Sequence, residues 1–89
     1  MTIIQLQPVL NKQKSFYNKA KVENIGKEKN LLSYGTLIVS IYNNKITYLN
    51  KNPEVYTQTT LKHLKDFLYQ ELNIKNLTKK DILKMMKDL

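Results

Sequence analysis

The 89-residue sequence contains no cysteine, no arginine and no tryptophan, a single histidine, and only two glycines and two prolines. Without cysteine, disulfides and thiolate metal sites are excluded. One histidine cannot complete a metal-ligand set, and the seven acidic residues show no convergent spacing that would pair two catalytic carboxylates. We therefore expect no cofactor and no metal, and we predict that the protein is not an enzyme.

Long hydrophobic runs are also missing. The longest apolar stretch is far shorter than the ~20 residues that a membrane-spanning helix needs, and residues 1–5 lack the charged start and apolar run of a signal peptide. The 42% of hydrophobic residues is nevertheless enough for a globular core. We expect a single domain over residues 1–89, no membrane association, and residence in the cytoplasm.

The charge is strongly one-sided, at +8, and every one of the fifteen basic residues is lysine. Lysine attracts phosphate as a point charge, whereas base readout and bidentate phosphate recognition favour arginine. The lysine excess therefore fits a partner that is acidic and contacted without sequence selectivity. An AT-rich genome would give the same abundance of lysine, asparagine, isoleucine and tyrosine, and both explanations stay open.

The first half of the chain shows strand patterns. A weakly alternating arm or edge strand, a strand with one wet face, a β-branched strand and a short returning strand are expected at 2–10, 15–25, 31–42 and 45–49. The continuous apolar character of the third predicts a central strand covered on both faces. A turn is expected at 26–30, a two-residue hairpin turn at Asn43-Asn44, and a bulge or close backbone approach at Gly35.

The second half of the sequence shows helical patterns. Thr57 is a candidate N-cap for a helix at about 58–72, and Thr78 with Asp81 resembles a capping box before a short helix at about 79–88. The apolar arc of the longer helix holds Leu61, Leu64, Phe67, Leu68 and Leu72. Strands followed by helices predict an α+β fold: an antiparallel meander of three to four strands covered by one main helix, plus a short C-terminal helix.

Four separated blocks, at 13–17, 19–22, 32–36 and 59–68, carry a family resemblance. Their sequences are QKSFY, KAKV, LSYGT and TTLKHLKDFL. In this order and spacing they resemble an uncharacterised family of small proteins encoded by phages, plasmids and conjugative elements of low-GC Gram-positive bacteria. The family usually has asparagine where Gly35 stands. The resemblance implies a mobile-element origin and no defined activity.

Two functions follow as hypotheses. Small accessory proteins of phages and plasmids commonly act on host machinery, so the favoured hypothesis is an inhibitor of a host defence nucleoprotein, such as an anti-CRISPR protein that contacts the effector or its guide RNA. The alternative is a direct, weakly sequence-selective nucleic-acid-binding protein. A structural protein of the virion is a third and less favoured class for so small and basic a chain.

His63 and the Thr59-Thr60 pair lie at the start of the longer helix. We predict that His63 is a structural residue that hydrogen-bonds the hairpin, with Asp66 three residues later as a group that could orient it. The threonine hydroxyls are expected to satisfy backbone groups of the first helical turn. Alternatively, the free amides of this turn, with Lys62 nearby, receive an anion.

Aromatic residues alternate with lysines along the chain, a pattern that fits base stacking, a protein interface or cross-strand packing. From this pattern the candidate partner-binding residues on the exposed sheet face or its rim are Tyr17, Lys19, Tyr48 and Lys51. Further candidates from the helical half are Lys62, Lys79 and Lys80.

Overall fold

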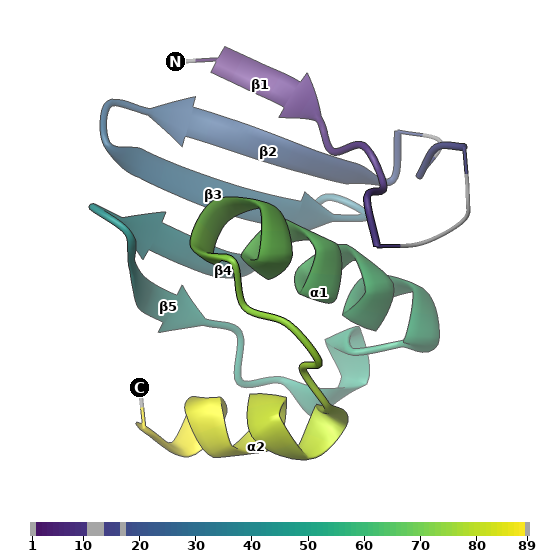
Figure 1. Ribbon diagram of the computed structural model, residues 1–89, viewed down its shortest axis with the longest axis vertical. Coiled ribbons are helices and arrows are strands. Elements are labelled where there is room, and N and C mark those ends of the chain that lie inside the picture. The colour runs from purple at the N-terminus through teal and green to yellow at the C-terminus, as the bar shows by residue number, and fades with distance from the viewer. Residues whose placement is uncertain (1, 11–13, 17, 89) are drawn as a thin grey trace.

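A computed structural model (Figure 1) describes residues 2–10, 14–16 and 18–88. Within these residues one antiparallel sheet has five strands in sequence order, followed by a short 3-10 helix and two α-helices. The elements are β1 (Thr2–Gln5), β2 (Ala20–Ile25), β3 (Glu28–Ser33), β4 (Thr36–Tyr42), β5 (Lys45–Leu49), η1 (Pro53–Val55), α1 (Gln58–Leu72) and α2 (Lys79–Asp88). The α+β prediction is confirmed, with five strands in place of three to four.

The additional strand comes from a turn inside the segment predicted as one strand at 31–42. Tyr34 and Gly35 have φ angles of 51° and 78°, and they join β3 to β4 as a two-residue hairpin. Positive φ at both central residues is what a type I′ turn requires. The prediction of a bulge at Gly35 within a continuous strand is therefore wrong, because the chain reverses there.

The other two hairpin turns lie at the opposite ends of β3 and β4. Asn43 and Asn44 form the predicted two-residue turn, with φ angles of 51° and 66°. The turn predicted at 26–30 is shorter, since Ile25 already pairs with Glu28 and only two residues remain between these strands. Gly26 supplies the positive φ in this turn.

The helices cover one face of the sheet, as Figure 1 shows, with α1 lying across the strands and α2 at one end of the molecule. Leu64, Phe67 and Leu68 of α1 are fully buried, and so are Leu31 and Val39 of the strands. The core of the domain therefore lies between one face of the sheet and the buried side of α1.

The apolar run in β4 contains a β-bulge that was not predicted. Leu31 of β3 pairs with Val39, and the next residue, Leu32, pairs with Leu37. Ile38 of β4 is therefore an extra residue with no partner in β3. Ile38 and Val39 are both fully buried although they are consecutive, which a bulge permits. The face opposite α1 carries no helix among the described residues (Figure 1). Ser40 lies on that face and is nevertheless buried, so the predicted burial on both faces holds for residues 38–41.

Local capping defines where both helices begin. Thr57 Oγ1 accepts a hydrogen bond from the Thr60 amide at 3.2 Å, which confirms the predicted N-cap. Thr78 and Asp81 exchange bonds, with the Thr78 amide donating to Asp81 Oδ2 at 2.9 Å and the Asp81 amide donating to Thr78 Oγ1 at 3.2 Å. These bonds satisfy amides that a helix start otherwise leaves free.

The N-terminal segment joins the sheet to the helical layer. β1 is an edge strand, and the chain then crosses toward α1, where the amides of Val9 and Leu10 donate to Asp66 Oδ1 at 2.8 and 3.2 Å. The side-chain amide of Gln70 donates to the Gln7 carbonyl at 2.7 Å and to Asp66 Oδ1 at 2.9 Å. Asp66 is fully buried, so a carboxylate on α1 clamps a segment far away in sequence.

Candidate functional site

His63 lies at the centre of a buried hydrogen-bonded cluster. Its Nδ1 is 2.8 Å from Ser33 Oγ, and Ser33 Oγ is 2.9 Å from Thr60 Oγ1. Ser33 is the last residue of β3, directly before the hairpin turn. His63 therefore hydrogen-bonds the hairpin, as its position predicted. Within the described residues, the Thr60 hydroxyl bonds the side chains of Ser33 and Thr57 and no backbone group, which corrects that part of the expectation.

In this cluster a serine hydroxyl is hydrogen-bonded to an imidazole. In an active site, these two groups can act as nucleophile and base. Ser33 is 2% exposed and His63 is fully buried, however, so very little of either side chain reaches solvent. No described residue hydrogen-bonds His63 Nε2, whereas a catalytic base is held by a third group. The arrangement suits a packed polar network that joins α1 to the hairpin.

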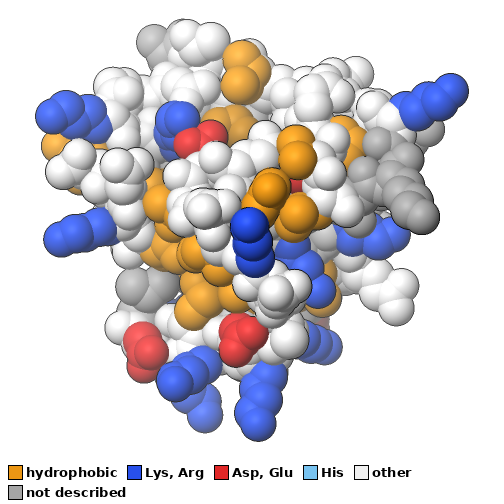
Figure 2. All heavy atoms as spheres, in the orientation of Figure 1, with side chains coloured by type: hydrophobic (Ala, Val, Ile, Leu, Met, Phe, Trp, Pro, Cys, Tyr) orange, Lys and Arg blue, Asp and Glu red, His pale blue; other side chains and the backbone are white. Residues whose placement is uncertain are grey.

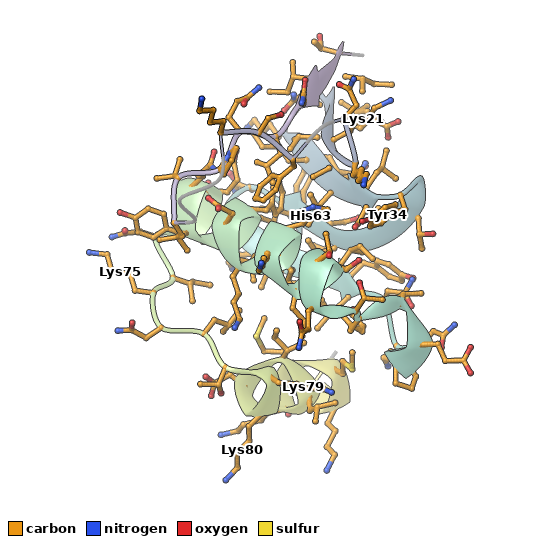
Figure 3. The ribbon with its side chains drawn as sticks, turned by 90° about the vertical axis from the view of Figure 1, so that its right-hand side faces the viewer. Lys21, Tyr34, His63, Lys75, Lys79 and Lys80 are labelled. Atoms are coloured by element: carbon orange, nitrogen blue, oxygen red, sulfur yellow. The ribbon has the colours of Figure 1, made fainter. Side chains whose placement is uncertain are left out.

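The surroundings of His63 favour its neutral form. The Phe16 ring meets it edge-on with centroids 4.5 Å apart, and the Tyr34 ring lies 6.1 Å away. Burial lowers the pKa of His63, the Asp66 charge partly opposes this, and the Lys19 charge lowers the pKa further. Figure 3 shows His63 between α1 and the strand end that carries Tyr34.

A hollow of about 400 Å³ opens beside this cluster, at the start of α1. Hydroxyl groups dominate its lining, and the charged residue among the described residues that line it is Glu54. An acidic wall repels anions, and Lys62 does not contribute to the lining. The alternative in which the first turn of α1 receives an anion with Lys62 is therefore disfavoured.

Seven of the fifteen lysines lie on α1, on α2 or on the segment between them, and we call this set the lysine face. It consists of Lys62, Lys65, Lys75, Lys79, Lys80, Lys84 and Lys87. Within the described residues the one ion pair joins Lys29 to Glu71 at 2.6 Å, so the lysine face is not neutralised by direct pairs. Figure 2 shows several of its blue side chains projecting around α2, with two acidic groups beside them.

Most acidic residues of the same layer accept hydrogen bonds from other groups of the protein. Asp66 is buried against backbone amides, Glu71 accepts from Lys29, and Asp81 bonds the Thr78 amide and hydroxyl. Those two Thr78 bonds lower the pKa of Asp81 and keep it ionised within its cap. These hydrogen bonds do not remove the charge of a carboxylate, so the acids still offset part of the lysine charge. With seven lysines against Asp66, Glu71, Asp81 and Asp88, the layer nevertheless stays net positive and attracts external anions.

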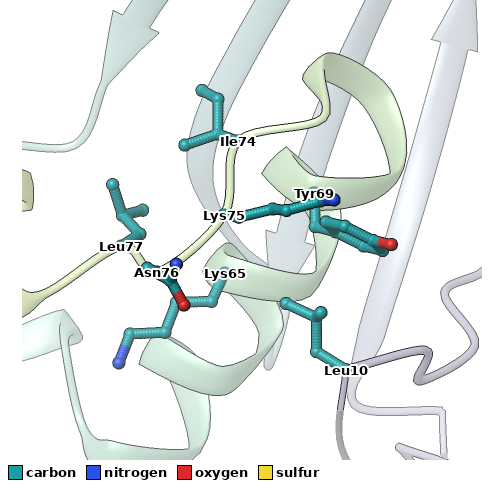
Figure 4. Close-up of a pocket in the computed structure, with 7 residues that line it drawn as sticks. All are labelled: Leu10, Lys65, Tyr69, Ile74, Lys75, Asn76 and Leu77. Atoms are coloured by element: carbon teal, nitrogen blue, oxygen red, sulfur yellow. The ribbon is translucent and has the colours of Figure 1, made fainter.

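The lysine face borders an open hollow of about 510 Å³, which we call the Tyr69 hollow (Figure 4). It is lined by Leu10, Lys65, Tyr69, Ile74, Lys75, Asn76 and Leu77. The Lys75 Nζ lies 5.9 Å from the centroid of the Tyr69 ring, close enough for a cation–π contact. The hollow thus combines an aromatic ring, two cations and apolar walls, with no acidic residue among the described residues that line it.

The predicted contact residues fall in separate places. Tyr17 lies outside the described residues. Lys19 is exposed, with its Nζ 5.6 Å from the Tyr34 ring centroid. Tyr48 and Lys51 share a hollow of about 370 Å³ beside β5, at the sheet edge opposite β1.

The remaining predicted contacts, Lys62, Lys79 and Lys80, are exposed on the helices, and Figure 3 places Lys79 and Lys80 on α2. The structure thus does not gather the predicted set into one site. Sequence reasoning missed Leu10 and Lys65 as lining residues. Lys65 and Tyr69 are four residues apart on α1 and so share one side of it, which is the local signal that could have paired them.

The described residues contain no group of three or more histidines and acids that could hold a metal ion. Nor does any helix in this part of the chain have the length and apolarity to cross a membrane.

The chain is thus a small, basic α+β domain with a lysine-rich helical layer. Residues 4–84 match a family of unknown function (DUF8033), and the chain belongs to that family. No curated protein and no solved structure matches the chain significantly. Membership agrees with the resemblance to an uncharacterised family and assigns no activity, so a function has to be argued from the sites.

Proposed function

We propose that the protein is a non-enzymatic binding protein that contacts the phosphates of a nucleic acid through the lysine face. The observation that carries the proposal is the set of lysines around α1 and α2, which have no direct acidic partner within the described residues and lie next to an aromatic hollow. Lysine ammonium groups supply charge without bidentate geometry, so binding is expected to be salt-dependent and weakly sequence-selective.

Salt titration tests this proposal. Labelled RNA and DNA are titrated with the protein at several KCl concentrations, and log affinity should fall linearly with log salt concentration. The triple variant Lys62→Gln, Lys80→Gln, Lys84→Gln should bind more weakly and show a shallower slope. The slope should decrease by about 0.7 to 0.9 for each phosphate that the variant no longer neutralises.

A matched control removes the same charge from the sheet and its turns. Lys21, Lys27 and Lys45 are exposed there, and the corresponding triple Lys→Gln variant should keep most of the affinity and nearly the same slope. Equal decreases in the two variants would mean that net charge alone matters and that the lysine face is not the binding surface. A salt-independent isotherm would reject nucleic-acid binding altogether.

The narrower proposal is that the protein is an accessory protein of a mobile element and acts in the cytoplasm of a host cell. There its binding inhibits a defence nucleoprotein such as a CRISPR effector. The family resemblance supports it. A protein at +8 is unsuited to mimic DNA in a basic channel, so guide RNA or an acidic protein patch is the expected contact.

Inhibition assays with CRISPR effectors from low-GC Gram-positive hosts, with and without guide RNA, test the narrower proposal. With purified protein, inhibition should saturate near stoichiometric amounts, give a complex on size exclusion, and be abolished in the lysine-face triple variant. Unaffected cleavage at large molar excess, with no complex, would exclude those effectors as targets.

A further inference from the structure

We infer that the Tyr69 hollow receives one unpaired base of a single-stranded nucleic acid, stacked on Tyr69, with the flanking phosphates at Lys65 and Lys75. This inference rests on the proposed nucleic-acid binding and adds the site and the form of ligand. It predicts that the protein binds single strands more tightly than duplexes, a preference that phosphate contacts alone do not give.

Three segments that are distant in sequence build the hollow. Lys65 and Tyr69 come from α1, Lys75 and Asn76 from the segment between the helices, and Leu10 from the N-terminal segment. Figure 4 shows Lys75 extending toward Tyr69, with Leu10 approaching from the other chain segment. The volume of about 510 Å³ lies within the roughly 300–1,000 Å³ of small-ligand sites.

The walls of the hollow are held in place before any ligand arrives. Leu10 is fixed by the bond from its amide to Asp66. On the other side, Asn73 ends α1 in a left-handed conformation with its amide bonded to the Tyr69 carbonyl at 2.9 Å, and the Ile74 amide bonds the Leu68 carbonyl at 3.4 Å. A half-buried ring between fixed walls loses little freedom when a planar group stacks on it.

The chemistry of the lining selects among anionic ligands. A free phosphate would use the two lysines but gain nothing from Tyr69 or from the apolar Leu10, Ile74 and Leu77. A nucleobase uses the ring and the apolar walls, and the phosphates that flank it use Lys65 and Lys75. A base inside a duplex is stacked and paired, so it cannot enter.

Anisotropy titrations of the full chain test the inference with three probes at one salt concentration: a dT12 strand, a duplex of the same length, and a dT12 strand with abasic positions. The wild-type protein should bind dT12 more tightly than the other two. Tyr69→Ala should weaken dT12 binding at least about fivefold, leave duplex binding unchanged, and abolish the advantage of dT12 over the abasic strand.

Further variants separate stacking from folding. Tyr69→Phe should retain dT12 affinity, whereas Tyr69→Leu, which fills the space without a flat ring, should lose it as Tyr69→Ala does. Tyr42→Ala is the matched control, because Tyr42 is exposed on the sheet and its register places it on the face opposite α1. Lys65→Gln and Lys75→Gln should each reduce the single-strand salt slope by about 0.7.

The outcomes separate this inference from the proposed function. Equal affinity for all three probes, unchanged by Tyr69→Leu but lowered by the lysine-face triple variant, would overturn the inference and leave the proposed function standing. Absence of salt-dependent binding to every probe would overturn both. Tighter, Tyr69-dependent binding of poly-glutamate than of dT12 would assign the hollow to an acidic protein and overturn the inference.

Discussion

His63 shows, at the scale of single residues, how burial turns an ordinary side chain into a determinant of acid stability. Its ring is enclosed between α1, the hairpin and Phe16, and its Nδ1 is committed to Ser33. Burial lowers its pKa below the ordinary value of 6.5. The unfolded chain therefore binds a proton at a higher pH than the folded domain does.

The contribution of His63 to stability should consequently be full well above pH 6.5, where both states hold a neutral imidazole, and should decline as the pH falls through 6.5. We expect the urea midpoint to be lower at about pH 5.5 than at about pH 7.5. His63→Gln should flatten this difference even if it lowers both midpoints, because glutamine does not titrate. Parallel pH dependences in the two proteins would assign the acid sensitivity to other groups.

Asp66 is the second residue whose burial has a specific consequence. Its carboxylate accepts bonds from the amides of Val9 and Leu10 and from the Gln70 side chain. Hydrogen bonds to a charged acceptor contribute about 1.5–3 kcal/mol, so Asp66→Asn should lower the free energy of unfolding by about 2 kcal/mol in urea melts. Asp88→Asn, at the exposed end of α2, should change it by less than about 0.5 kcal/mol.

At the scale of elements, the Tyr34-Gly35 turn divides the apolar segment into two strands. A Cβ at Gly35 would meet no atom within 4 Å, so the cost of a side chain there is the cost of φ +78° alone. Gly35→Ala should destabilise the domain by about 1–2 kcal/mol in thermal or urea melts. Gly35→Asn should cost less, because asparagine tolerates positive φ. An alanine variant as stable as wild type would argue against the hairpin geometry.

Elements with local signals were predictable from sequence. Both helices, their caps at Thr57 and Thr78, and the Asn43-Asn44 turn depend on residues within a few positions of one another. The Tyr34-Gly35 turn was missed because tyrosine is unusual at positive φ and apolar residues continue on both sides of it. The ring of this tyrosine lies near His63 and Lys19, which are distant in sequence, and a sequence pattern does not show such contacts.

For the candidate site, the sequence indicated the types of residue involved but not which of them lie together. Lysine excess and interleaved aromatics were visible, and they led to Tyr48 and Lys51 as well as to the helices. Which of them lie together depends on a long-range contact, since Leu10 reaches α1 through a bond to Asp66 that spans 56 residues. Nothing in the local sequence around Leu10 indicates a clamp of that kind.

The whole molecule depends on one small core between a single sheet face and α1. Phe67 is fully buried at its centre, and a large-to-small change there should cost about 3–5 kcal/mol. A domain of this size has little stability to lose, so Phe67→Ala should be mostly unfolded by circular dichroism or by urea melts. Leu83→Ala, on the exposed side of α2, is the control and should change stability by less than about 1 kcal/mol. Overlapping melts of Phe67→Ala and wild type would refute the core assignment.

The hydrogen bonds to Asp66 also make the amides of Val9 and Leu10 a probe of the docking of α1. The side chains of Val9 and Leu10 are 58% and 48% exposed, and amides in such segments ordinarily exchange their protons with solvent quickly. Here those protons are directed at a buried carboxylate on α1, so exchange requires the helix to separate from the N-terminal segment. In deuterium-exchange experiments these two amides should be as slow as amides inside α1, and they should lose protection together with it. A ligand that fills the Tyr69 hollow, whose wall Leu10 forms, would slow them further, so they record both helix docking and occupancy of the hollow.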